Sequence, residues 1–195
     1  MLNRNFANLI STQFKDSSFN NGRSIHLLDL TGEEVTPYWS STSNSYPCNR
    51  FFWQIANIVT TKLSSLTSDV NTGRSTFTLG SGNTSESIED YNLEFPIDET
   101  NFTILSNNRA FTADNYSNNS VTFSQVWTYA GESAIEIKEI GFVSNISINP
   151  GNNVSVPKNF LFDRTVLDNP ITVTNGDTFT ISLTIGGKAT VVVNS

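Results

Sequence analysis

Grouped catalytic side chains are scarce in this chain of 195 residues. The only histidine is His26, so a two-histidine metal site cannot form, and no cysteine stands near it in the sequence. Its neighbours Ile25 and Leu27 are typical of a half-exposed strand position rather than of a catalytic one. The only cysteine, Cys48, cannot form an internal disulfide and is interpreted as a small, partly buried apolar residue.

Carboxylates are concentrated between residues 86 and 99, a stretch without lysine or arginine. Closely spaced carboxylates can hold Ca²⁺, but this spacing matches no EF-hand loop, and we favour a solvated acidic loop. A carboxylate pair for glycoside hydrolysis is defined by its spatial separation, which spacing in the sequence does not test, and no positive feature supports one. We therefore predict no catalytic residues, no metal and no cofactor. The acidic residues of the stretch are Glu86, Glu89, Asp90, Glu94, Asp98 and Glu99.

The segment Gly80-Ser81-Gly82 follows a predicted strand, as phosphate-binding loops do. It lacks the Gly-Lys-Ser/Thr ending and is followed by acidic residues, so it is predicted to be a turn. The net charge of −7 and the scattered positions of the 11 basic residues argue against nucleic acid as a partner. No apolar run reaches membrane-spanning length and no leader pattern is recognised, so we expect cytoplasmic synthesis without membrane insertion.

Aromatic rings on a surface can stack on sugars, and the candidates for this chemistry are Tyr38 and Trp39. Both lie in a polar stretch that has proline at each end, which predicts an exposed loop. Trp127 lies in an alternating pattern instead, so we assign it to the core. A host-surface glycan is therefore one partner that the sequence allows.

Alternation of apolar and polar residues dominates the chain after residue 75 and predicts a series of short strands. Gly186-Gly187 predicts a hairpin turn into the last strand, and a slip of phase at 139–141 predicts a bulge. No helices alternate with the strands, so the predicted fold class is all-β: a β-sandwich of jelly-roll or immunoglobulin-like type. Thr180, Ser182 and Thr184 should face outward. The residues expected between the sheets are Phe123, Trp127, Ile135, Ile137, Ile140, Phe179, Ile181, Leu183 and Ile185.

The part before residue 75 is less regular. Residues 2–14 form the best helix candidate, because apolar side chains recur there at offsets of three, four and seven. An isolated helix of this length is marginal in water, so it must dock on the chain's own sheet or on a neighbouring subunit. Short strands are predicted over 25–30 and 51–62, with polar loops between them.

Four segments in the last two-thirds of the chain form an ordered pattern. In order and spacing, this pattern resembles that of tailed-bacteriophage virion structural proteins, which have a strand ending in Gly-x-Gly, an Asp-Tyr-x-Leu unit, an Ile-x-Glu-Ile-Gly strand and a closing Arg, Pro-Ile-Thr-Val and Gly-Asp series. The matching segments are residues 77–84, Glu89-Asp90-Tyr91-Asn92-Leu93, Ile137-Lys138-Glu139-Ile140-Gly141 and residues 161–181.

The resemblance implies a non-enzymatic virion protein, assembled on the particle as a capsid decoration or head-fibre component. Tail or baseplate component, and receptor- or glycan-binding module, are the alternatives. The implied partners are other virion proteins and further copies of the chain, and the implied location is the virion. Two interpretations of Arg164 are open: it is a charge at the edge of a sheet, or it is a buried ion-pair partner of Asp163 or Glu139.

For a protein assembled on a particle, we divide the chain into an N-terminal attachment segment with a short helix and loops, residues 1–50, and a β-sandwich domain, residues 51–195. Phe6, Leu9 and Ile10 on the helix are then the predicted subunit contacts. Deletion of residues 1–20 is expected to leave a folded sandwich that no longer assembles.

Overall fold

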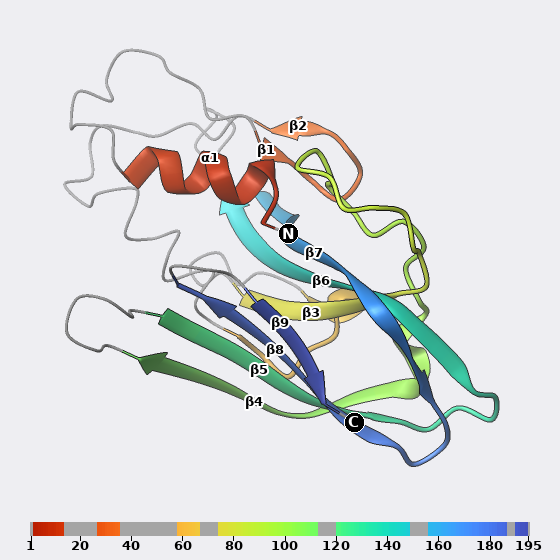
Figure 1. The fold of residues 1–195 in the computed structure, drawn as a ribbon. Coiled ribbons are helices and arrows are strands. Elements are labelled where there is room, and N and C mark those ends of the chain that lie inside the picture. The colour runs from red at the N-terminus through yellow and green to blue at the C-terminus, as the bar shows by residue number, and fades with distance from the viewer. Residues whose placement is uncertain are drawn as a thin grey trace.

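The computed structural model describes residues 2–13, 27–35, 58–66, 74–112, 120–148, 156–186 and 190–194. Strands dominate, and the all-β class is confirmed. The elements are shown in Figure 1. They are α1 (Arg4–Gln13), β1 (Leu27–Leu28), β2 (Glu34–Val35), the 3₁₀ helix η1 (Leu63–Ser65), β3 (Arg74–Gly80), the 3₁₀ helix η2 (Glu99–Asn101), β4 (Phe102–Thr112), β5 (Ser120–Tyr129), β6 (Ile135–Ile148), β7 (Val156–Val173), β8 (Thr178–Ile185) and β9 (Thr190–Asn194).

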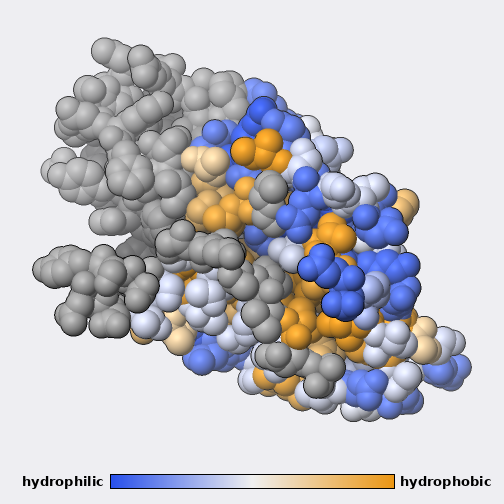
Figure 2. Space-filling view, viewed as in Figure 1, coloured by the Kyte–Doolittle hydropathy of each residue, from blue (hydrophilic) through white to orange (hydrophobic). Residues whose placement is uncertain are grey.

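The strands form antiparallel sheets that lie in layers. One sheet has the order β3-β6-β7 and a second has the order β4-β5-β8-β9, while β1 and β2 form a small ribbon beside α1 (Figure 1). The two larger sheets share one apolar core. Figure 2 shows hydrophobic side chains gathered along the middle of this face, with hydrophilic ones over the β1–β2 region. Whether the arrangement is of jelly-roll or immunoglobulin-like type stays a prediction.

Aromatic rings join the two sheets across the core. Phe123 on β5 stacks on Phe142 on β6, with ring centroids 5.1 Å apart. Within the four-stranded sheet, Phe102 on β4 packs 4.7 Å from the ring of Tyr129 and edge-on to Trp127, which is fully buried, as the sequence predicts. Such pairs add stability beyond the area that they bury.

The predicted register of the core is confirmed. Most of the residues expected between the sheets are at most 2% exposed, while Ile135 and Ile185 are partly buried and pack against the same core. Thr180, Ser182 and Thr184 occupy the alternate positions of β8 and are half-buried, since β8 lies between β5 and β9. A slip by one residue would have exchanged the two sets.

Two predicted elements differ from the structure. The strand expected over 51–62 is not present in its described part: Ile58 makes a single parallel bridge to Ser75, and residues 51–57 lie outside the described residues. The bulge expected at 139–141 is found next to that position, because the β6–β7 register shifts between Ile137 and Glu139. In β7 the shift falls beside Pro170, which cannot donate a ladder hydrogen bond.

The predicted N-terminal helix exists as α1, and it docks on the chain's own sheet. The backbone N–H of Asn3 donates to the carbonyl of Phe162 on β7, 3.1 Å away. The Asn5 amide donates to the carbonyls of Leu28 and Leu161, which joins α1, β1 and β7.

Phe6 packs edge-on against Phe162, with ring centroids 6.5 Å apart, and is 7% exposed. Phe6, Leu27 and Val35 belong to the same core cluster as the two larger sheets. The prediction that Phe6 contacts a neighbouring chain is therefore wrong, because the chain's own core buries that side chain. The side chains of Leu9 and Ile10 lie outside the described part of the structure. What is described of residues 1–50 joins the common core rather than standing apart from it.

Candidate functional site

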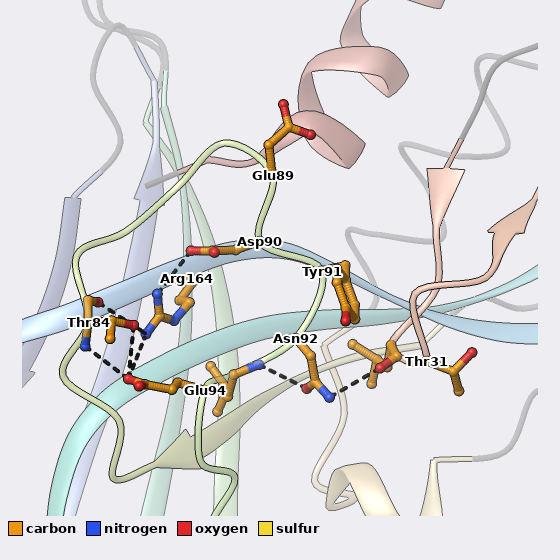
Figure 3. Close-up of a pocket in the computed structure, with 10 residues that line it drawn as sticks. Thr31, Thr84, Glu89, Asp90, Tyr91, Asn92, Glu94 and Arg164 are labelled. Atoms are coloured by element: carbon orange, nitrogen blue, oxygen red, sulfur yellow. Dashed lines mark hydrogen bonds and ion pairs between the residues drawn. The ribbon is translucent and has the colours of Figure 1, made fainter.

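A buried arginine organises the densest polar cluster that the structure describes (Figure 3). Arg164 projects from β7 and its side chain is 3% exposed. Its Nε donates to Oε2 of Glu139 on β6 at 2.7 Å, and its Nη1 donates to Oδ2 of Asp90 at 3.0 Å. Nη2 donates to the carbonyl of Thr84 at 3.2 Å. Of the two interpretations drawn from the sequence, the buried ion pair with Glu139 is confirmed.

The charge of Arg164 is retained despite burial. Desolvation opposes the charged form and would lower its pKa, but hydrogen bonds to Glu139 and Asp90 outweigh this and leave the pKa raised above the usual value of an arginine. The cluster therefore holds a permanent positive charge between carboxylates, which is the condition under which a buried ion is tolerated.

Glu139 links this charge to the loop that follows β3. Its side chain is fully buried, and Oε1 accepts hydrogen bonds from the backbone N–H groups of Gly82, at 3.1 Å, and Phe95, at 2.9 Å. A Cβ atom on Gly82 would lie 2.6 Å from Oε1 of Glu139, and one on Gly80 would collide with the same carboxylate. Gly80 is the last residue of β3, and Ser81 and Gly82 follow it in irregular structure, so the turn predicted here is not assigned; the two glycines admit a carboxylate rather than a phosphate.

The acidic stretch is solvated only in part: Glu89 and Asp98 are exposed, whereas other carboxylates bond to backbone groups. Glu94 Oε2 accepts from the backbone N–H groups of Asn83 and Thr84, each at 2.9 Å. Glu86 accepts from the N–H of Val166 at 2.8 Å, and Glu89 forms an ion pair with Arg4. Backbone donors of a loop and of a strand edge need acceptors, and these carboxylates supply them.

Two further carboxylates near the end of the same stretch cap backbone groups. Glu99 is 6% exposed and accepts from Thr78 Oγ1 at 2.8 Å and from the N–H of Leu79 at 3.3 Å. Burial raises its pKa, although those hydrogen bonds oppose the shift. Asp98 accepts from the Thr100 hydroxyl and N–H at the start of η2, and these hydrogen bonds lower its pKa.

An open pocket of about 470 Å³ lies beside the arginine cluster (Figure 3). The Tyr91 ring, 41% exposed, lies across Gly32, whose φ of +79° and close approach to the ring suit only glycine. Asn92 donates to the carbonyl of Leu30, which joins the pocket wall to the turn after β1. The lining residues are Leu30, Thr31, Thr84, Glu89, Asp90, Tyr91, Asn92, Leu93, Glu94 and Arg164.

A second ion cluster holds the β1–β2 turn against β7. Lys158 Nζ donates to Oδ2 of Asp29 at 2.8 Å and to Oε2 of Glu33 at 2.6 Å. Desolvation would raise the pKa of Asp29, but hydrogen bonds from Lys158 and Thr31 together lower it to about 2. This turn carries Thr31 and Gly32, so the cluster also fixes one wall of the pocket.

The chemistry of the pocket is hydrogen bonding and ring stacking. Within the described ranges, no three histidine, cysteine or acidic residues are grouped so as to hold a metal ion. The Thr84 backbone N–H is the largest influence that lowers the pKa of Glu94, so this carboxylate stays ionised, the opposite of a general acid. The helices that are described are also too short or too polar to cross a membrane.

The sequence-predicted site residues do not meet in this cluster. Phe6 lies in the core, and Tyr38, Trp39, His26 and Cys48 lie outside the described residues, as do the side chains of Leu9 and Ile10. The sequence analysis missed Asp90, Glu94 and Tyr91 as members of one site. The available signal was that the Asp-Tyr-x-Leu unit and the Arg164 segment belong to one recurring pattern.

Compared with known protein families, curated proteins and solved structures, the chain shows no match.

Proposed function

We propose that the chain is a non-enzymatic structural component of a tailed-bacteriophage virion, placed as a capsid decoration or head-fibre protein. A tail or baseplate position is the variant of this proposal that the same observations support. The observation that carries it is the meeting of the resembling segments in one place. Gly82, Asp90, Glu139 and Arg164 come from separate parts of the pattern and bond to one another around the arginine.

The apolar members of the pattern also fit one another. A Cβ atom on Gly141 would lie 2.9 Å from Cδ1 of Leu161 and 3.1 Å from Cδ2 of Leu93. The glycine of Ile-x-Glu-Ile-Gly and the leucine of Asp-Tyr-x-Leu are thus mutually required by close packing. A pattern whose members serve to hold a loop on a sheet supports a scaffold rather than a catalyst.

The test is whether the chain is a stable part of particles. Particles from a lysate of the phage that encodes the chain are banded by density, washed in high salt and examined by peptide mass spectrometry and by immunogold labelling with antibody against the purified chain. We expect the chain in the banded particles, with gold at a fixed position on the head or the tail. Recovery of the chain in the particle-free fraction alone would refute the proposal.

Binding of a host-surface glycan is the second candidate, because the pocket joins an exposed ring to hydrogen-bonding groups. Pyranose rings stack on tyrosine, and hydroxyl groups bond carboxylates and amides such as those of Asp90 and Asn92. Titration of the purified chain with neutral mono- and disaccharides, followed by NMR, tests this. Shifts that saturate in the wild type and are absent in Tyr91→Ala support glycan binding, and absence of saturable shifts in the wild type opposes it.

A further inference from the structure

The outer edges of the three-stranded sheet are covered by the chain's own groups. On β3, the N–H of Phe77 donates to Oε1 of Gln125 at 3.1 Å, and the N–H of Leu79 donates to Glu99. The backbone of Val59 and Ile97 continues this cover, each donating at 2.9 Å to a β3 carbonyl. Unpaired edge groups are templates for another strand, so this cover closes one route of association.

The outer edge of β7 is closed in the same way. The N–H groups of Asn3 and Leu30 donate to β7 carbonyls, each at 3.1 Å, and the N–H of Val166 donates to Glu86. Farther along the strand, Asp168 and Pro170 occupy exposed positions. A charge and a proline are common devices against edge-to-edge pairing.

Strand β4 is an edge of the four-stranded sheet without such cover. Over its eleven residues it pairs with β5 on one side. Apart from Phe102, whose N–H donates to the carbonyl of Glu99, and from Arg109, no backbone group of β4 is hydrogen-bonded by any described residue outside β5. From Leu105 to Thr112 every residue is exposed, and Leu105 and Phe111 are 56% and 68% exposed. A long open edge with exposed apolar side chains is a surface for strand pairing.

The charges favour a second copy of the chain as the partner. The chain carries a net charge of −7, yet neither β4 nor β5 contains an acidic residue. Arg109, the one charged residue of the two strands, lies over the Phe111 ring with its Cζ 5.1 Å from the centroid. Two copies that approach through β6 or β7, which carry acidic residues, bring carboxylates together, whereas two copies that approach through β4 do not.

We propose that two copies pair antiparallel through β4, so that their four-stranded sheets join into one continuous sheet. A two-fold axis at Asn108 places Arg109 of one copy opposite Asn107 of the other, and residues 106–110 then pair without meeting the register shift between Ile104 and Ser106. Like charges are not directly opposed in this register. The proposal rests on the sheet edge and is independent of the proposed role in a virion.

The test begins with the mass of the purified full chain, measured by light scattering after size exclusion over a range of concentrations. We expect a dimer for the wild type and a monomer for Ser106→Glu/Ala110→Glu, because position 106 of each copy faces position 110 of the other and two pairs of carboxylates would then face each other across the axis. The dissociation constant should rise by at least about 10-fold. Asn169→Glu/Thr172→Glu, which adds the same charge at exposed positions of β7, is the matched control and should stay dimeric.

A charge-swapped mixture makes the test specific for β4. Ser106→Lys/Ala110→Lys should also be monomeric, and mixing it with the glutamate variant should restore a mixed dimer, since opposite charges then face each other. Amide hydrogen exchange of residues 102–112 should slow with concentration in the wild type. A monomeric wild type, a dimeric glutamate variant, or a mixture that stays monomeric would each overturn pairing through β4. A dimeric glutamate variant would point to the β9 edge instead.

Discussion

The Nε of Arg164 lies 2.7 Å from Oε2 of Glu139, and both side chains are almost completely buried between β7, β6 and the loop after β3. Replacing a buried ion pair by apolar residues can be neutral, but removing one partner leaves an uncompensated charge. A single substitution in this pair therefore tests how much the contact between the loop after β3 and the strands β6 and β7 contributes to the stability of the protein.

Glu139→Gln keeps the size of the side chain and removes the charge that balances Arg164. We expect the free energy of unfolding to fall by about 3 kcal/mol, measured by urea denaturation. Glu136→Gln on the same strand breaks an exposed ion pair with Lys138 and should change it by less than about 1 kcal/mol. If the two substitutions change the free energy of unfolding equally, the buried ion pair contributes no more to stability than the exposed one.

The glycines of the Gly80-Ser81-Gly82 segment should be intolerant of a side chain. A Cβ atom on Gly82 would lie 2.5 Å from Cβ of Glu94, so Gly82→Ala must shift the loop and should destabilise the protein by about 1–3 kcal/mol. Ser81→Ala changes an exposed residue of the same segment and should be close to neutral. Thermal melts of the two variants give the comparison, and a Gly82→Ala melt like that of the wild type would contradict the packing described above.

Asp29 makes stability depend on acid pH. Its pKa is about 2 in the folded chain and 3.8 ordinarily, so the folded state prefers the ionised form. The stabilisation is complete above the unfolded value and is lost as the pH falls from about 4 toward 2. Asp29→Asn should cost about 2 kcal/mol at neutral pH.

The difference between wild type and Asp29→Asn should shrink as the pH falls from about 4 and should disappear only below about pH 2, where both carry a neutral side chain. Urea denaturation at several pH values measures it. A difference that is constant over this range would show that the loss reflects packing and not the ion pair with Lys158.

Glu99 should behave in the opposite sense. Burial raises its pKa, so the folded state prefers the protonated form, and the ionised carboxylate opposes folding above the folded pKa. Glu99→Gln retains an acceptor for Thr78 and Leu79 and should be at least as stable as the wild type at neutral pH. Its advantage should vanish as the pH falls below the ordinary glutamate range.

Asp98, the neighbouring residue, is the matched control, because its hydrogen bonds to Thr100 lower its pKa. Asp98→Asn should lose stability at neutral pH while Glu99→Gln does not. If the stabilities of the two variants changed with pH in the same direction, the two adjacent carboxylates would not lie in environments that shift their pKa values in opposite directions.

Local pattern was sufficient to predict the core, but not the polar cluster. In β8, alternation alone separates Phe179 and Ile181 from Thr180, because strand periodicity is a local property. Asp90 and Arg164, by contrast, stand 74 residues apart and meet only after β6 and β7 have paired. The acidic stretch contains no basic residue of its own, so charge alone favoured a solvated loop.

The N-terminal helix also shows that a local pattern can predict an element without predicting its packing partner. Its periodicity predicted a helix with an apolar face, and α1 confirms it, but periodicity does not say which surface covers that face. Phe162 on β7, the partner of Phe6, is distant in the sequence, and Asn3 and Asn5 bond to main-chain carbonyls that no side-chain pattern marks. An anchor on another subunit was therefore as consistent with the sequence as the observed dock.

The docking of α1 reverses the expected effect of N-terminal truncation. Deletion of residues 1–13 removes the Phe6 ring from Phe162 and the Asn5 amide from the carbonyls of Leu28 and Leu161, exposing part of the core. We expect the truncated chain to melt well below the wild type or to fail to fold. Phe6→Ala should lower the free energy of unfolding by about 3–5 kcal/mol, whereas Ala7→Ser on the exposed side of the helix should change it by less than about 1 kcal/mol. Melting of the truncated chain at the wild-type temperature would show instead that the helix is separable, and would restore the attachment segment.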